Sequence, residues 1–207
     1  MSALAHTLSG RRSAARVRLA DVVLIVLGSA VVALLAQVSF RLPFTPIPIT
    51  GQTLGVLLVG ASLGSARGST ALLLYLGEGA AGLPVFAEAK RGLALLATSS
   101  VTGGYLWGFV VAAFVVGWLA ERGWDRNFGS ALGAMLVGLI VIFSFGCTWL
   151  TVALSVPARE ALELGLYPFV LGDLLKLLIA AGVLPLAWKI AGPQRGRLSS
   201  RDFVTRS

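Results

Sequence analysis

The hydrophobic pattern of the chain consists of apolar stretches separated by short charged or proline-rich breaks. An apolar run of about 17–25 residues is long enough to cross the hydrocarbon core of a bilayer as a helix. Six spans are predicted on this pattern, at residues 22–40, 52–64, 68–83, 103–120, 128–156 and 168–189. The predicted fold class is therefore an all-α polytopic membrane protein, a bundle of six transmembrane helices.

The composition agrees with a membrane protein, because 57% of the residues are hydrophobic and 13% are charged. A soluble domain has about 45–50% apolar and about 25% charged residues. The net charge of +8 is carried mainly by residues in the termini and short loops, where basic residues set membrane topology. Nucleic-acid binding is therefore not indicated. We expect a basic tail at residues 1–18, a membrane domain at 19–191 and a second basic tail at 192–207.

The basic residues also predict an orientation. Six spans put both tails on the same side, with twelve basic residues there and four on the opposite side. Because basic residues favour the cytoplasmic side, both termini are expected in the cytoplasm. The loop with Pro43, Pro46 and Pro48, the connection at 84–102 and the start of the sixth span would then all face outward. Together they predict an outward-facing ligand pocket.

Asp173 and Lys176 are the most unusual residues, because they lie inside the last apolar stretch. A charge near the middle of a span costs roughly 2.5–3.5 kcal/mol on insertion scales. Three positions apart on a helix, the two side chains share a face and can touch. They predict either a polar ligand site or an ion pair that holds helices together.

Other polar side chains near the predicted mouth are weaker candidates. Lys90 and Arg91 are either solvated loop charges or cations that bind an anionic ligand. Arginine is the better suited of the two to a carboxylate, because it can donate to both oxygen atoms. Gln52 either satisfies backbone groups at its helix start or offers an amide at the lip of the pocket. Aromatic residues near the membrane edges are interpreted, for the most part, as interfacial anchors: Tyr75, Tyr105, Trp107 and Tyr167.

On the first span, Ser29 and Ala33 are small residues four positions apart. Small residues at this spacing let a second helix approach closely. The neighbour could be another helix of the same chain or another subunit, and the sequence leaves both open. Glu78 lies near the outer end of its span and is assigned no role.

Several enzyme classes are excluded by the sequence. Residues 60–64 match the serine-hydrolase pattern G-x-S-x-G, but the one histidine, His6, precedes every span and is no suitable base. No metal-binding motif and no P-loop GxxxxGK[ST] is present, and Cys147 is the one cysteine. We expect no enzyme activity, no metal and no cofactor.

Four motifs in order give the chain a family resemblance over residues 25–190. They are LPFTPIPIT with QTLG at 42–55, GLPVFA at 82–87, TGGYLWGF at 102–109, and YPF with GDLLK at 167–176. With these motifs the chain resembles the biotin-specific substrate-binding (S) subunit of energy-coupling-factor transporters, the BioY family. One departure is the loop after GLPVFA, usually glycine-rich in that family and here Glu88-Ala89-Lys90-Arg91.

The resemblance implies biotin uptake and a role for each candidate. Asp173 and Lys176 would contact the bicyclic ring, and Arg91 or Lys90 would hold the carboxylate. Gln52, Phe86 and Tyr167 would complete the substrate site, and Ser29 with Ala33 would dock a partner.

The implied partners are a transmembrane coupling subunit and two ATP-binding-cassette ATPases, in the cell (inner) membrane of a bacterium or archaeon. The alternative is a self-sufficient, homo-oligomeric biotin facilitator or secondary transporter.

Overall fold

The computed structural model describes residues 14–191, with side chains described for 18–186. Its long helices are α2 (Ala14–Gln37), α3 (Gln52–Leu63), α4 (Ser65–Ala80), α5 (Gly103–Glu121), α6 (Phe128–Ala153) and α8 (Val170–Ala191). Shorter elements connect them: strands β1 (Ser39–Phe40) and β2 (Ile49–Thr50), helix α7 (Ala158–Gly165), and the 3-10 turns η1 (Ala87–Ala89), η2 (Leu93–Leu96) and η3 (Tyr167–Phe169).

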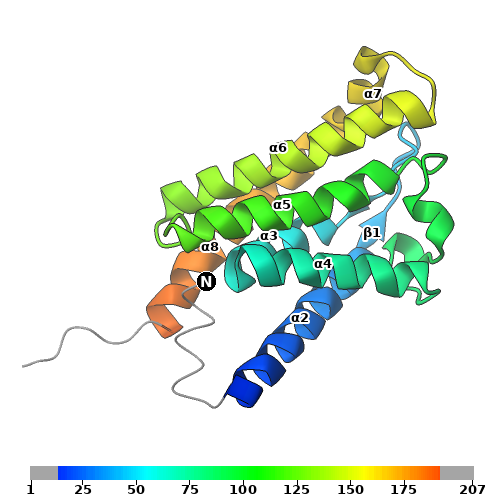
Figure 1. Ribbon diagram of the computed structural model, residues 1–207. Coiled ribbons are helices and arrows are strands. Elements are labelled where there is room, and N and C mark those ends of the chain that lie inside the picture. The colour runs from blue at the N-terminus through cyan, green and yellow to red at the C-terminus, as the bar shows by residue number, and fades with distance from the viewer. Residues whose placement is uncertain (1–13, 192–207) are drawn as a thin grey trace, which may run out of the picture.

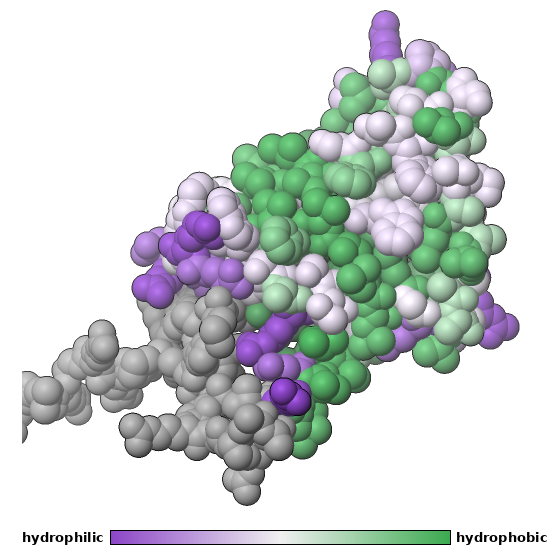
Figure 2. All heavy atoms as spheres, viewed as in Figure 1, coloured by the Kyte–Doolittle hydropathy of each residue, from purple (hydrophilic) through white to green (hydrophobic). Residues whose placement is uncertain are grey.

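The long helices form a bundle whose two ends differ (Figure 1). At one end lie the strand pair, the 81–102 connection and α7. At the other end lie the α3–α4 junction and the α5–α6 turn. Figure 2 shows hydrophobic side chains over the middle of the visible face, with hydrophilic groups toward its ends. This distribution is that of a multi-pass membrane protein.

Four helical stretches of the described residues are long and apolar enough to cross a membrane: Arg18–Gln37, Gly103–Glu121, Phe128–Ala153 and Ala158–Leu186. The two other predicted spans correspond to α3, a shorter apolar helix, and α4, which has 16 residues. Helix α7 was not expected from the sequence, in which residues 157–166 are predicted as a connection between two spans.

The proline-rich segment is a hairpin rather than an irregular loop. Ser39 pairs with Thr50 and Phe40 with Ile49 in an antiparallel ladder. The first span therefore ends at Gln37, three residues earlier than predicted, and the fold is not strictly all-α. The prolines fill the turn between the two strands, where no ladder hydrogen bond is required of them.

Close helix contacts depend on glycine. A Cβ on Gly117 of α5 would lie 2.4 Å from the carbonyl carbon of Gly64, between α3 and α4. A Cβ on Gly104 would lie 2.2 Å from the Cβ of Trp149 on α6. Side chains at these positions would force the helices apart. The glycines of the G-x-S-x-G match at 60–64 therefore permit close helix packing. The glycines of TGGY let α6 lie close to α5.

Candidate functional site

The site is a cavity between β2, α3, the η1 segment, α5, α6, η3 and α8, with about 690 Å³ of atom-free space including its mouth. The turn of the hairpin contributes Ile47 and Pro48, so the proline-rich segment forms part of the wall. Its other walls are mostly aliphatic and aromatic, with polar groups at two separate places.

The first polar place, here called the floor cluster, consists of Asp173, Lys176, Thr50 and Thr53. Lys176 Nζ lies 2.6 Å from Asp173 Oδ1 and donates to the carbonyl oxygen of Thr50 at 2.6 Å. Thr53 Oγ1 donates to Asp173 Oδ1 at 2.9 Å. The ion pair predicted as one alternative therefore exists, and both of its members also line the cavity. The two interpretations are compatible.

The floor cluster is held by three separate elements. Asp173 and Lys176 are on α8, Thr53 is in the first turn of α3, and Thr50 ends β2. Each charge thus gains hydrogen bonds beyond its ion pair, which offsets the cost of removing both charges from water. Within the described residues, both hydrogen bonds to the Asp173 carboxylate end on Oδ1, which leaves Oδ2 available to a donor on a ligand.

A chain of polar side chains runs beside the floor cluster. Thr50 Oγ1 donates to Gln52 Oε1 at 3.0 Å, and Gln52 Nε2 donates to the Tyr75 hydroxyl at 2.6 Å. Tyr75 in turn donates to the carbonyl oxygen of Val85 at 3.2 Å. Gln52 is buried and lines the cavity instead of standing at its lip.

The aromatic residues divide into two groups. Tyr75 and Tyr105 are buried, so the interpretation as interfacial anchors is wrong for both. Tyr105 lines the cavity, and its hydroxyl donates to the carbonyl oxygen of Gly165 at 2.8 Å. Trp107 and Tyr167 are exposed, and neither is part of the cavity wall described here.

Phe86 forms part of the cavity wall, where the family motif suggested it. Its ring packs edge-on against Tyr75, with the centroids 5.4 Å apart. The absence of a side chain at Gly79 makes room for it, because a Cβ there would lie 2.1 Å from Phe86 Cζ. Phe143 and Phe169 also line the cavity, and their ring centroids are 6.2 Å apart. Aromatic faces such as these can hold a flat or alicyclic ligand.

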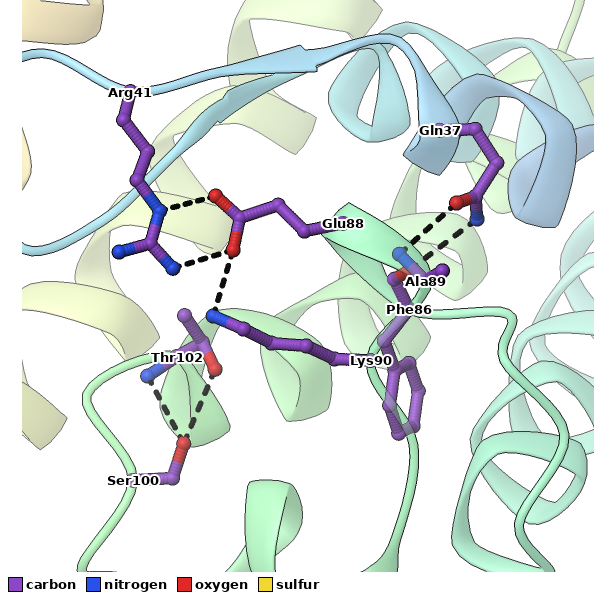
Figure 3. A network of polar contacts seen from close by, with 8 residues as sticks. All are labelled: Gln37, Arg41, Phe86, Glu88, Ala89, Lys90, Ser100 and Thr102. Atoms are coloured by element: carbon purple, nitrogen blue, oxygen red, sulfur yellow. Dashed lines mark hydrogen bonds and ion pairs between the residues drawn. The ribbon is translucent and has the colours of Figure 1, made fainter.

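The second polar place, here called the mouth bridge, consists of Arg41, Glu88 and Lys90 (Figure 3). Lys90 Nζ lies 2.8 Å from Glu88 Oε2, and Arg41 donates to Glu88 through both Nε and Nη2. Hydrogen bonds from Arg41 and then Lys90 lower the pKa of the Glu88 carboxyl to about 2. Lys90 lines the cavity, whereas Arg91 is exposed and is not part of its wall.

The pair predicted for docking faces the interior of the chain. Ser29 is buried, and its hydroxyl donates to Glu78 Oε2 on α4 at 2.6 Å. Ala33 is partly buried against the core. Gly28 brings α4 still closer, because a Cβ there would lie 3.0 Å from that of Ala71. Of the two alternatives for these small residues, the structure favours packing within the chain.

The cavity can bind a small molecule that is polar at one end, apolar in the middle and anionic at the other end. Sequence reasoning missed Thr50, Thr53 and Tyr105 as parts of this site. The two threonines were quoted as motif residues but given no role, and their contacts with α8 span 120 and 126 residues of sequence. Among the described residues no group of three or more histidine, cysteine, aspartate or glutamate side chains could hold a metal ion.

Comparison with known proteins gives concordant matches. The profile described as the BioY family matches residues 9–193. A biotin transporter BioY of Rhizobium etli is 37% identical over 169 residues, which are 78% of this chain and 89% of that protein. A biotin transporter BioY of Thermotoga maritima is 40% identical over 140 residues, which are 68% of this chain and 80% of that protein.

The fold is also similar to a crystal structure of the S-component for biotin from an ECF-type ABC transporter. The TM-score is 0.76 at 22% sequence identity, with 86% of this chain and 95% of that chain covered.

Proposed function

The chain belongs to the BioY family, and on this premise we propose that it is a membrane subunit that captures biotin from outside the cell and passes it inward. The observation that carries the proposal is the floor cluster: a buried carboxylate and an ammonium group, side by side in the wall of an apolar cavity. Biotin is a small molecule with a polar ring system, an apolar chain and a carboxylate, which is the sequence of chemical groups that the cavity suits.

The ureido group of biotin has two N–H donors and one carbonyl acceptor. Asp173 accepts one N–H, and Lys176 donates to the carbonyl oxygen while it keeps its contact with Thr50. Gln52 lies beside this cluster and adds an amide to the same wall. A ligand without the ureido group would leave these buried polar groups unpaired, which gives strong discrimination.

Phe86, Phe143 and Phe169 contact the bicyclic ring and the aliphatic chain of biotin. The carboxylate then lies near the mouth of the cavity, where Lys90 is the cation in the wall. We assign the carboxylate to Lys90 rather than to Arg91, because Arg91 is not part of the cavity wall. Tyr167 is exposed and receives no contact with the ligand in this assignment.

The sequence contains no P-loop, so this chain cannot supply energy for transport by hydrolysing ATP at such a loop. We propose that a transmembrane coupling subunit and two ATP-binding-cassette ATPases drive delivery of biotin. The similarity to the S-component of an ECF-type ABC transporter supports this arrangement. The site would open outward from the cell membrane of a bacterium or archaeon, the inner membrane where there are two, with both termini in the cytoplasm.

The binding proposal is tested on the purified chain in detergent with radiolabelled biotin. We expect stoichiometric binding in the unmodified protein and its loss in Asp173→Asn and in Lys176→Ala. Glu160→Gln removes an exposed carboxylate from α7 and is the matched control, which should bind normally. Normal binding by both floor variants would contradict the site assignment.

The transport proposal is tested by biotin uptake in cells with and without the coupling subunit. We expect uptake at low external biotin to depend on that subunit. Undiminished uptake in its absence would favour the self-sufficient homo-oligomeric transporter instead.

A further inference from the structure

The three charges of the mouth bridge are not equivalent. Glu88 is shared by two cations, but only Lys90 of the three residues belongs to the cavity wall. Arg41 lies outside the wall, and its side chain is largely exposed to solvent. Arg41 holds Glu88 through two nitrogen atoms, whereas Lys90 holds it through one. A two-armed arginine–carboxylate pair is stronger and more fixed in direction than a single lysine contact.

Glu88 is held in place from a direction other than that of Lys90. Glu88 and Ala89 have backbone φ angles of 61° and 54°, in the left-handed region that glycine favours. Gln37 on α2 holds this segment at two points, since its Oε1 accepts from the Ala89 N–H at 3.1 Å and its Nε2 donates to the Phe86 carbonyl oxygen at 3.3 Å (Figure 3). The position of Glu88 therefore does not depend on its contact with Lys90.

A ligand carboxylate at the mouth and the Glu88 carboxylate would compete for the same ammonium group. Because Glu88 keeps both contacts with Arg41, it stays neutralised when Lys90 leaves it. Lys90 can thus change partner without leaving an unpaired charge behind. The Glu88 carboxyl, whose pKa is held near 2, is ionised throughout the physiological range and always takes part in this competition.

From this arrangement we propose that Glu88 and Arg41 are selectivity-determining residues, which set how strongly the site prefers a ligand with a free carboxylate over the same ligand with a neutral tail. Glu88 pairs with the Lys90 ammonium group and so weakens the preference for a ligand carboxylate. Arg41 also pairs with Glu88, which weakens the hold of Glu88 on Lys90 and strengthens that preference. Neither residue has to touch the ligand. The inference rests on the proposed function, because it assigns the carboxylate of biotin to Lys90.

The test compares dissociation constants for biotin and for biotin methyl ester, measured by calorimetry on the purified protein. The quantity of interest is the ratio of the ester constant to the biotin constant. Since exposed ion pairs have small energies, we expect the ratio to rise about threefold in Glu88→Gln and to fall about threefold in Arg41→Gln. Opposite signs distinguish competition for Lys90 from a simple structural role, because two partners that only brace the loop would change the ratio in the same direction.

Two further variants remove the effect of net charge. Arg41→Lys keeps the charge but loses the fork, so the ratio should still fall. Arg91→Gln removes a charge from the same loop outside the mouth bridge and should change the ratio less than Arg41→Gln does, because the ion pairs described for Glu88 are with Arg41 and Lys90. A ratio that does not change in Glu88→Gln, or that falls in it, would overturn the inference. If the unmodified protein bound neither ligand, the proposed function itself would fail.

Discussion

Two lysine–carboxylate pairs meet the cavity, one with both members in the wall and one with the lysine alone, and the pairs differ in their surroundings rather than in their length. Lys176 and Asp173 are 2.6 Å apart, with side chains 16% and 2% exposed. Lys90 and Glu88 are 2.8 Å apart, with side chains 43% and 24% exposed. The first pair is fixed on one helix and hydrogen-bonded from two other elements, whereas the second is on a loop in which Glu88 has a left-handed backbone.

The burial of each pair and the backbone that carries it therefore determine whether the pair stays fixed or can exchange partners. Breaking the buried pair leaves a charge without water and is costly. Breaking the exposed pair costs little, since water solvates Lys90 and Arg41 remains paired with Glu88. The floor cluster is therefore suited to recognise a fixed ring, and the mouth bridge is suited to exchange partners.

The strongest effect on stability should come from the floor cluster. Asp173→Ala leaves Lys176 partly buried without its carboxylate and should lower the free energy of unfolding by about 3–5 kcal/mol. The double variant Asp173→Ala with Lys176→Met removes both charges and should regain most of that loss without regaining biotin binding. Unfolding in mixed micelles measures both. A double variant no more stable than the single one would show that the unpaired lysine is not the source of the loss.

A smaller effect is expected in the polar chain beside the floor. Gln52→Leu leaves the buried Tyr75 hydroxyl without one hydrogen-bond partner and should cost about 1–3 kcal/mol of unfolding free energy. Adding Tyr75→Phe removes that hydroxyl, and the combined variant should be more stable than the sum of the two single changes predicts. Strict additivity in this double-mutant cycle would show that the two side chains do not interact.

Beside the mouth bridge, one backbone substitution is expected to raise stability rather than lower it. Ala89→Gly relieves a left-handed non-glycine residue and should leave stability unchanged or raise it by up to about 1 kcal/mol. Ala87→Gly, two residues earlier and outside the left-handed region, is the control and should lower stability. Equal losses in both variants would argue against strain at Ala89.

The weakest effect should be that of pH on the mouth bridge. The pKa of Glu88 is lowered from 4.5 to about 2, so its stabilising contribution is complete above about pH 4.5 and is lost only as the pH falls through about 2. The preference for biotin over its methyl ester should therefore be constant between pH 8 and pH 5.5. A marked change of this preference within that range would show that Glu88 is not held ionised by its partners.

The sequence predicts the charged pair of the floor cluster but not its two threonines, because two charges three residues apart in an apolar run are costly unless they meet each other or a polar ligand. The mouth bridge could not be predicted in the same way, since Arg41 and Glu88 are 47 residues apart and meet only when the hairpin folds over the η1 segment. Tyr75 and Tyr105 were misjudged for a related reason. Their apparent positions at membrane edges gave no sign that Gly146 and Gly165 open space for the Tyr105 ring inside the bundle. They also gave no sign that Tyr75 packs against Phe86, for which Gly79 makes room.

The floor is assigned to the ring of the ligand and the mouth to its carboxylate. This division is tested by the dissociation constants of biotin and biotin methyl ester for the unmodified protein, Lys176→Met and Lys90→Met. We expect Lys176→Met to weaken the binding of both ligands by the same factor. Lys90→Met should weaken the binding of biotin alone, so that the two ligands bind equally. Loss of the preference for biotin in Lys176→Met, with the preference kept in Lys90→Met, would contradict the division.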